Sequence, residues 1–283
     1  MGSAIVAPGC LSSSSPLLSP EDDFLATYDK VARIRRSLSG SITLVRHRLS
    51  GELFAMKTVC RDLPLCSENA RNEIELMTEL SRSIGGYDNV VQLADHLTLD
   101  RSTHIIVMEY VPGGDLLDLL QVNGPTPESK ARIVFQGIVR GLTALHRKWI
   151  CHLDLSLENI LLSKDGAPKI CDLGQARRFK PGEYFRGRKG QCFKGPDADV
   201  WSLGVCLFCL LFACHPYRAT SSGAVNHEHL LRDGPQTLAH RWNLHPAVSD
   251  DAFDLLSAML RPAATRITLA DVAAHPWTNP LDT

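Results

Sequence analysis

The stretch 150–162 reads Ile150-Cys-His-Leu-Asp154-Leu-Ser156-Leu-Glu-Asn159-Ile-Leu-Leu162, and the rest of the chain can be organised around it. An aspartate and an asparagine stand five residues apart, between apolar residues that predict short strands. A second aspartate, Asp172, follows in the segment Lys169-Ile-Cys-Asp172-Leu-Gly174. We therefore expect three oxygen-bearing side chains on two short loops that converge on one site.

These three side chains can do two chemical jobs. One carboxylate can accept a proton from a hydroxyl, while the other carboxylate and the amide can hold Mg²⁺, a hard cation that prefers oxygen ligands. Such a cation is needed where a phosphoryl group is transferred, because its developing charge must be neutralised. Either motif alone fits an ordinary polar turn about equally well, but this order and spacing together favour phosphoryl transfer.

The two segments resemble the catalytic loop H-R-D-x-x-x-x-N and the metal-binding D-F-G motif of the protein kinase family. The resemblance extends from about Tyr28 to Trp277. It implies an α+β, bilobal fold, with a small antiparallel sheet and one main helix in the N-lobe and a mainly helical C-lobe. We expect a disordered Ser/Pro-rich tail at 1–27, the N-lobe at 28–111 and the C-lobe at 112–283, with one kinase domain over 28–277.

The resemblance implies catalytic roles for the two loops. Asp154 resembles the catalytic base, and Asn159 and Asp172 resemble the Mg²⁺ ligands. Ser156 stands where the family usually has a lysine beside the transferred phosphate. Because serine can orient a substrate but carries no charge, we expect a slower chemical step.

A lysine and a glutamate earlier in the chain resemble the family's Lys–Glu pair. Lys57 follows Phe54-Ala-Met on a predicted strand, and its ammonium group can hold phosphate oxygens as a point charge. Glu73, on the helix that follows, is the residue expected to position Lys57. Glu75 is the alternative, although Asn72-Glu73-Ile74 fits the family pattern better.

The resemblance also implies an ATP pocket between the lobes. Met108 would be the gatekeeper, the backbone of Glu109 and Val111 would bond adenine, and Asp115 would bind the ribose. The apolar residues that would enclose adenine, and that suit an ordinary core equally well, are Ile42, Ala55 and Leu161. Of the usual three glycines above the phosphates, only Gly40 remains.

The hydrophobic pattern gives a coarse secondary structure. In the first part it predicts strands at 31–34, 42–45, 53–59, 90–93 and 104–110, and a helix with its N-cap at Ser67. Pro112-Gly113-Gly114 is the expected hinge. Beyond it we expect helices that start at Thr126-Pro127-Glu128 and at 199–212, 251–260 and 269–274, and a solvated loop around His227-Glu-His229.

Composition excludes several other classes of protein. The 283 residues carry a formal net charge of −1, which does not suggest nucleic-acid binding. The nine cysteines are scattered through apolar segments, as expected for reduced thiols in a cytosolic protein. The apolar run 203–214 is shorter than the ~20 residues of a membrane span, and no signal peptide precedes it. We therefore expect a cytoplasmic protein without a membrane span, with the nucleus left open.

The sequence departs from the family pattern at the glycine-rich loop and in the catalytic loop. Arg35 and Ser37 replace two glycines, which prevents the closest backbone approach to phosphate, although Arg35 or Arg36 could supply charge instead. Leu153 replaces the arginine that usually pairs with a phosphate on the activation segment. Because Tyr184 is the only hydroxyl between Asp172 and Asp199, we expect no activation by serine or threonine phosphorylation there.

The activation segment is also short and basic. The A-P-E motif is missing, so Arg266, which resembles that motif's usual partner, would lose its ion pair. Residues 177–194 carry seven basic residues and one acid. This composition fits either a solvated loop or a surface for an acidic substrate or partner. Asp115 and Glu158, in contrast, match positions that favour basic substrates in many kinases, so the sequence leaves both readings open.

Three functions remain in view. The leading hypothesis is an ATP- and Mg²⁺-dependent protein kinase that phosphorylates serine or threonine on a protein substrate. The alternative is a weak or inactive pseudokinase that acts as a nucleotide-binding or scaffold module. The third is a small-molecule phosphotransferase of the aminoglycoside-kinase kind. Against this third function stand Asp172-Leu-Gly, the buried-aspartate motif Asp199-Val-Trp-Ser-Leu-Gly and the closing segment His275-Pro-Trp277.

Overall fold

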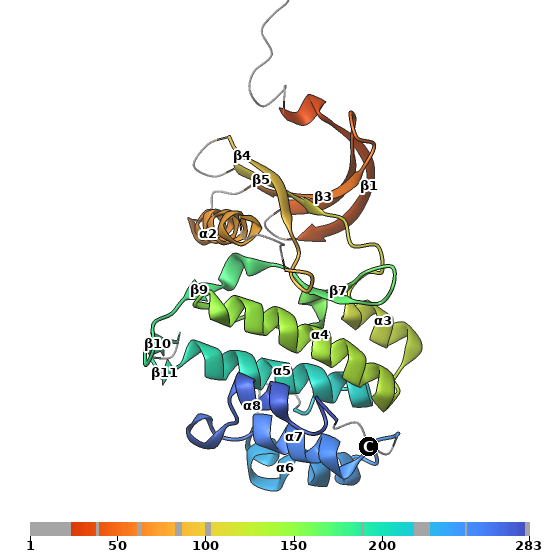
Figure 1. The fold of residues 1–283 in the computed structure, drawn as a ribbon, viewed down its shortest axis with the longest axis vertical. Coiled ribbons are helices and arrows are strands. Elements are labelled where there is room, and N and C mark those ends of the chain that lie inside the picture. Colours follow the sequence, from red (N-terminus) through yellow and green to blue (C-terminus); the bar gives the residue numbers. More distant parts are fainter. Residues whose placement is uncertain are drawn as a thin grey trace, which may run out of the picture.

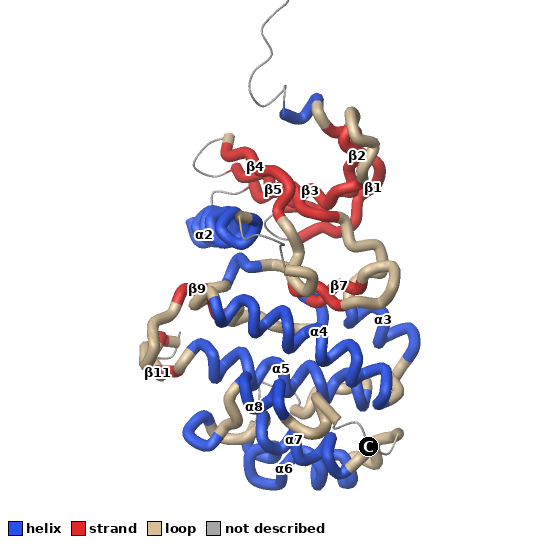
Figure 2. Tube along the Cα trace, viewed as in Figure 1, coloured by secondary structure: helices blue, strands red, loops and turns tan. Residues whose placement is uncertain are grey.

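The chain forms a small N-lobe that contains a sheet and a larger, mainly helical C-lobe (Figures 1 and 2). The computed structural model describes residues 24–37, 40–60, 64–82, 87–99, 103–187, 190–217, 227–246 and 248–280. The predicted α+β, bilobal fold is therefore confirmed. The expected tail at 1–27 lies almost wholly outside the described residues.

The N-lobe sheet is antiparallel, with the strand order β1-β2-β3-β5-β4. Its strands are β1 (Tyr28–Ser37), β2 (Gly40–His47), β3 (Leu53–Cys60), β4 (Leu93–Thr98) and β5 (Thr103–Glu109). The strand predicted at 90–93 is wrong for its first part. Val90 makes only an isolated bridge to Ile170 of the C-lobe, because its apolar side chain is buried in the core that joins the lobes.

Helix α2 (Pro64–Ser81) packs against β3, β4 and β5. It begins three residues before the predicted N-cap Ser67, in keeping with the preference of proline for the first helical turn. Ala70, Ile74, Met77 and Leu80, which have helical spacing, are all buried. This stripe fixes which face of α2 looks toward the sheet and the cleft.

The expected hinge is bonded to the strand that follows the catalytic loop. The Gly113 N–H donates to the Leu162 carbonyl and the Leu162 N–H donates to the Gly114 carbonyl, both at 2.9 Å. Gly114 has φ +76°, a conformation that glycine adopts at little cost. The hinge therefore lies against the end of the stretch 150–162 in space, although the two are far apart in the sequence.

The C-lobe helices are α3 (Leu116–Asn123), α4 (Glu128–Arg147), α5 (Gly195–Phe212), α6 (Glu228–Arg241), α7 (Asp250–Met259) and α8 (Leu269–Ala274). The pattern did not predict α3 or α6. The expected loop around His227 is wrong, since α6 begins at Glu228; His227 precedes it at the N-cap position without a side-chain capping bond, and its ring packs against Trp201 and Tyr217. Gly234, with φ +78°, and Pro235 kink α6 and obscure its periodicity.

Short elements carry the catalytic stretch between α4 and α5. They are β6 (Ile150–Cys151), η1 (Leu157–Asn159), β7 (Ile160–Leu162), β8 (Pro168–Ile170), η2 (Leu173–Gln175), β9 (Arg177–Arg178), β10 (Phe185–Arg186) and β11 (Cys192–Phe193). β7 pairs with β8, β6 with β9 and β10 with β11. The predicted short strands on either side of Asp154 and Asn159 are confirmed.

The C-lobe core surrounds α5, whose residues 203–212 are all buried. This helix is long and apolar enough to cross a bilayer by length and composition, and 72% of it lies inside the protein. Trp277 is also buried; its ring packs edge-on to Phe135 at 5.6 Å and its Nε1 donates to Glu128 Oε1 at 2.7 Å. The closing segment 275–277 therefore fastens the end of the domain to α4.

Candidate active site

Lys57, Glu73 and Asp172 form a charged cluster between the lobes. Lys57 Nζ donates to Glu73 Oε2 at 2.7 Å and to Asp172 Oδ1 at 3.1 Å. Burial opposes the charge on Lys57, but the two carboxylates outweigh it and raise the pKa of Lys57. Burial also raises the pKa of Glu73, with Lys57 acting against that rise. The strand, the helix and the loop predicted to meet at this point do meet.

Helix α2 is held onto the loop that carries Asp172. Asn72 Nδ2 donates to the Ala176 carbonyl at 2.8 Å, just beyond η2. Two turns further along, Glu79 is paired with Arg178 of β9. Glu75, the alternative partner for Lys57, instead lies 3.8 Å from Arg178 and is exposed. Glu73 is therefore the residue that reaches Lys57.

Asp199 positions the backbone of the catalytic loop. It lies within α5 and is fully buried, as the buried-aspartate motif implied. Its carboxylate accepts the N–H groups of His152 and Leu153, each at 2.8 Å, and lies 2.8 Å from His146 Nε2. These bonds compensate its burial. They also hold Leu153 at φ +62°, a conformation that costs a non-glycine residue energy.

Asp154 and Asn159 lie side by side on the loop that Asp199 supports. Asn159 Nδ2 donates to the Asp154 carbonyl at 2.8 Å and more weakly to Asp154 Oδ2 at 3.4 Å. Burial, together with the charges of Asp172 and Glu158, raises the pKa of Asp154. A higher pKa makes this carboxylate a stronger base for a hydroxyl proton.

The donor set of Asn159 and Asp172 fits a magnesium ion. Asp172 Oδ1 is used by Lys57 and Gly174 N–H. Within the described chain, Asp172 Oδ2 and Asn159 Oδ1 accept no protein hydrogen bond, which leaves one hard oxygen on each residue. Mg²⁺ commonly uses one or two protein ligands and completes its shell with phosphate and water. No group of three or more His, Cys, Asp or Glu side chains suited to a metal occurs among the described residues.

The residues expected around adenine line the junction of β2, β3, β5 and β7. Met108 is buried and Ile42, Ala55 and Leu161 are half-buried. The Val111 N–H, just past β5, takes part in no hydrogen bond in the described part of the chain. The Glu109 side chain is used elsewhere: it accepts from Gln92 N–H at 2.8 Å and from Lys169 Nζ at 2.9 Å.

We call β1 and β2 the roof of the cleft, and the side chains of Lys57, Glu73, Asp154, Asn159 and Asp172 its floor. The roof departs further from the kinase pattern than the floor does. Gly40 lies in β2, where any side chain would clash with the Thr58 carbonyl, so this glycine has a packing role. Arg35 of β1 reaches down to the C-lobe: its Nη2 lies 2.9 Å from Asp115 Oδ2 and its Nη1 3.8 Å from Glu158 Oε2. Asp115 Oδ1 meanwhile caps α3 by accepting the Asp118 N–H at 2.8 Å. The sequence marked Arg35 as unusual but did not indicate these partners.

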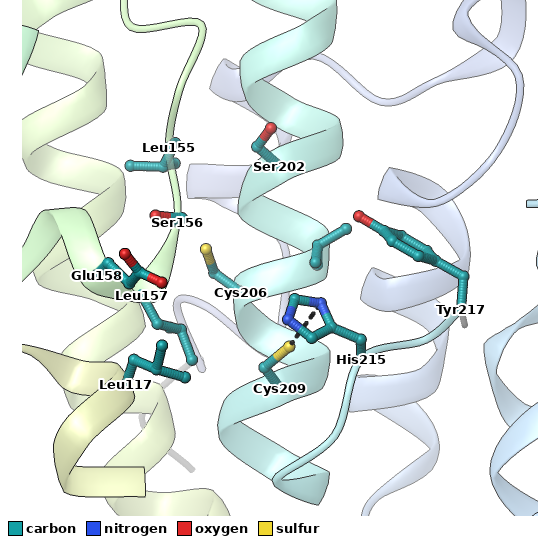
Figure 3. A pocket seen from close by; sticks show the side chains of 11 residues that line it. Leu117, Leu155, Ser156, Leu157, Glu158, Ser202, Cys206, Cys209, His215 and Tyr217 are labelled. Carbon is teal, nitrogen blue, oxygen red and sulfur yellow. Dashed lines mark hydrogen bonds between the residues drawn. The ribbon is translucent and has the colours of Figure 1, made fainter. Parts of the chain in front are cut away.

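A cavity of about 190 Å³ opens beside Ser156 (Figure 3). Figure 3 shows the catalytic loop at the left and α5 in the middle, with His215 beside Cys209 and Tyr217 to the right of α5. Cys209 Sγ lies 3.7 Å from His215 Nδ1. Burial raises the pKa of Cys209 to about 12, so this thiol stays protonated. The lining is mainly apolar: Leu117, Leu155, Ser156, Leu157, Glu158, Ser202, Val205, Cys206, Cys209, His215 and Tyr217.

The short activation segment leaves Arg266 with carbonyl partners instead of a carboxylate. Arg266 donates to the carbonyls of Asp197 at 2.6 Å and Arg261 at 2.8 Å, and its guanidinium stacks on Trp201 at 5.0 Å. In the activation segment itself, Tyr184 is 61% exposed, and the centroid of its ring lies 5.5 Å from Lys194 Nζ. The expected absence of activation through serine or threonine phosphorylation stays a prediction.

The chain is similar to known kinases over most of its length. A family model described as "Protein kinase domain" matches residues 28–278. The chain is 32% identical over 275 residues to calcium-dependent protein kinase 1 of Oryza sativa subsp. japonica and 31% identical over 275 residues to calcium-dependent protein kinase 17 of Arabidopsis thaliana. These matches cover 91% of the chain but only 51% and 50% of the two relatives, so the chain spans about half their length. It therefore belongs to the protein kinase family, with a protein kinase domain over residues 28–278.

Proposed function

We propose that this protein transfers the γ-phosphoryl group of ATP, with Mg²⁺, to serine or threonine hydroxyls of a protein substrate. The observation that carries the proposal is the contact of Lys57 Nζ with Glu73 at 2.7 Å and Asp172 at 3.1 Å. Three distant segments meet there around a lysine whose pKa is raised, and a buried ammonium at this point suits phosphate oxygens.

Each residue of the floor then has one task. Asp154 accepts the hydroxyl proton as the substrate oxygen attacks the γ-phosphorus and the bond to ADP breaks. Lys57 holds phosphate oxygens while Glu73 fixes the lysine, and Asn159 and Asp172 would hold Mg²⁺. The ion supplies positive charge against the phosphates. Ser156 orients the acceptor without adding charge, so the chemical step is slow for a kinase.

The nucleotide lies between β2, β3 and the hinge in this proposal. Ile42, Ala55, Met108 and Leu161 enclose adenine, while the Val111 N–H and the Glu109 backbone bond its edge. Asp115 meets the ribose, although Arg35 already engages one of its oxygens. We place the domain boundaries at 28–111 and 112–283, with the hinge between them.

The replaced glycines and the Arg35–Asp115 ion pair at the roof favour a second function, that of a pseudokinase. Arg35 and Ser37 stand in place of glycines, and Asp115 is paired with Arg35, so nucleotide affinity or geometry suffers. A pseudokinase would bind nucleotide weakly and act as a scaffold. The intact floor favours the enzyme, because a non-catalytic chain would gain nothing from a base beside the metal ligands.

Phosphate transfer from labelled ATP distinguishes the two functions. The wild-type protein and the Asp154→Asn variant are incubated with Mg²⁺ and generic protein substrates. We expect the variant to lose roughly 10²- to 10⁴-fold in rate, the usual contribution of a general base. Equal labelling by both proteins would reject the enzyme.

Nucleotide binding is measured separately from transfer. ATP with Mg²⁺ at ~100 times its Kd should stabilise the fold by about 2.7 kcal/mol, which a melting experiment detects. Asp154→Asn should keep this shift, since Asp154 is not among the proposed nucleotide-binding residues. A shift without transfer would support the pseudokinase.

A further inference from the structure

Of the five basic residues that the structure describes between Arg177 and Lys194, four form no ion pair, although Arg177 and Lys194 pack against the rings of Phe185 and Tyr184. Arg178 is the exception, since it pairs with Glu79 and lies near Glu75. The other described cations of the segment are exposed, and no carboxylate of the described chain lies within 4.0 Å of them. We call the following four residues the basic surface: Arg177, Lys180, Arg186 and Lys194.

The basic surface is attached directly to the catalytic machinery. Strand β9 begins two residues after η2, the turn that Asp172 caps. Arg177 pairs with Cys151 across β6 and β9, and Cys151 stands three residues before Asp154. The segment ends at Lys194, the N-cap residue of α5, the helix that contains Asp199. Free positive charge therefore starts beside the proposed acceptor site.

Two acids near that site argue for the opposite preference, but Arg35 offsets them. Its guanidinium lies between Asp115, at 2.9 Å, and Glu158, at 3.8 Å. The Asp115 side chain is only 9% exposed, so this ion pair is shielded from solvent on one side. In the cavity beside Ser156, Glu158 is the only carboxylate in the lining. A basic substrate residue would have to compete with Arg35 for both acids.

We propose that the acceptor site takes an acidic peptide segment, held by the basic surface, with Arg35 as a specificity-determining residue. Arg35 acts by occupying the carboxylates that would otherwise attract basic side chains. The inference rests on the proposed protein kinase function and adds its substrate class. Like-charge repulsion disfavours basic peptides at the same surface.

Three peptides test this substrate class. Each has the same serine acceptor, flanked by glutamate, glutamine or lysine, and kcat/KM is measured at saturating ATP and Mg²⁺. We expect the glutamate peptide to exceed the glutamine peptide about fivefold, with lysine lowest, given the modest strength of exposed ion pairs. The preference should shrink as salt is added, because exposed charges are screened.

Matched variants show which residues cause the preference for acidic peptides. The triple variant Lys180→Gln, Arg186→Gln, Lys194→Gln should bring the glutamate-to-glutamine ratio toward one. A control triple, Lys130→Gln, Arg147→Gln, Lys164→Gln, removes the same charge from exposed positions without an ion pair in the described structure, and it should keep the ratio. Arg35→Gln should raise the lysine-to-glutamine ratio several-fold.

The outcomes separate this inference from the function beneath it. A preference for the lysine peptide, or equal ratios in the two triple variants, would overturn the inference while transfer itself stands. If no peptide is labelled above the Asp154→Asn background, the kinase function fails instead. Fluorescence anisotropy of the same labelled peptides then decides: tighter binding of the glutamate peptide, lost only in the first triple, supports the acidic surface, and equal binding rejects it.

Discussion

The floor and the roof of the cleft have diverged differently from the kinase pattern. The floor keeps five residues in bonded positions: Lys57, Glu73, Asp154, Asn159 and Asp172. The roof has lost two glycines and gained Arg35, which binds the acids of the C-lobe. Transfer chemistry depends on the identity of the floor side chains, whereas a roof needs only a backbone that closes over phosphate. A kinase can therefore tolerate change above the nucleotide more readily than below it.

Among the variants that test the contrast between floor and roof, the largest effect is expected from removing the Lys57 cation of the floor. Lys57→Met leaves Glu73 buried without its partner and takes away a phosphate contact, so transfer should fall about 10²- to 10³-fold. Lys169→Met is a matched control, because the Lys169 side chain is 18% exposed, against 19% for Lys57, and is likewise paired with a glutamate. Steady-state kinetics of both variants measure the difference. Similar losses in both would remove the special role of Lys57.

The next-largest effect is expected from removing the Asp199 carboxylate, which supports the backbone of the catalytic loop. Asp199→Ala leaves the buried N–H groups of His152 and Leu153 without an acceptor. The free energy of unfolding should drop by about 2–4 kcal/mol, the cost of two such groups. Asp199→Asn keeps one acceptor oxygen and should lose less. Urea denaturation of the wild type, Asp199→Ala and Asp199→Asn measures the order of their free energies of unfolding. An alanine variant as stable as the wild type would contradict the supporting role of Asp199.

The acid dependence of the rate reports on Asp154. Because its pKa is raised, the carboxylate loses its basic form at a higher pH than an ordinary aspartate. The rate should therefore fall about tenfold per unit as pH drops below that pKa. Glu158 contributes to the rise, so Glu158→Gln should move this limb to lower pH. Arg35→Gly should move it little, because Arg35 is not among the groups that shift Asp154. A pH profile of kcat/KM tests both.

The smallest effect is expected at the roof. Arg35→Gly frees Asp115 for ribose and lets the backbone approach phosphate, so the KM for ATP should fall about three- to tenfold. A rise in KM would show instead that Arg35 itself binds the nucleotide. Arg33→Gly, an exposed position on the same strand with no acidic partner in the described residues, controls for added backbone freedom.

The floor could be predicted from sequence because its residues stand in fixed motifs. Asp154 and Asn159 share one loop, and Asp172 follows a short strand that pairs with the end of that loop. The resemblance to the kinase Lys–Glu pair indicated Lys57 and Glu73, with Glu75 as the alternative to Glu73. The sequence interpretation placed the start of α2 at Ser67 and did not use Pro64, which suits the first helical turn. It also did not show that Val90 lies in the core between the lobes, since tertiary packing decides this.

The roof could not be predicted in the same way. Arg35 and Asp115 are eighty residues apart, and a long flexible side chain can find many partners. The kink at Gly234 and Pro235 similarly hid α6, because the apolar period is broken there. The basic composition of 177–194 was visible in the sequence, but only the structure shows that Arg178, among the described cations of this segment, is already paired.

The link between Arg178 and Glu79 gives the cleft a fixed starting shape. The ion pair between α2 and β9, together with the hydrogen bond from Asn72 to the Ala176 carbonyl, keeps α2 against the Asp172 loop, where Glu73 reaches Lys57. A nucleotide bound between the lobes, as proposed, would meet a preassembled pocket and lose little ordering entropy on arrival.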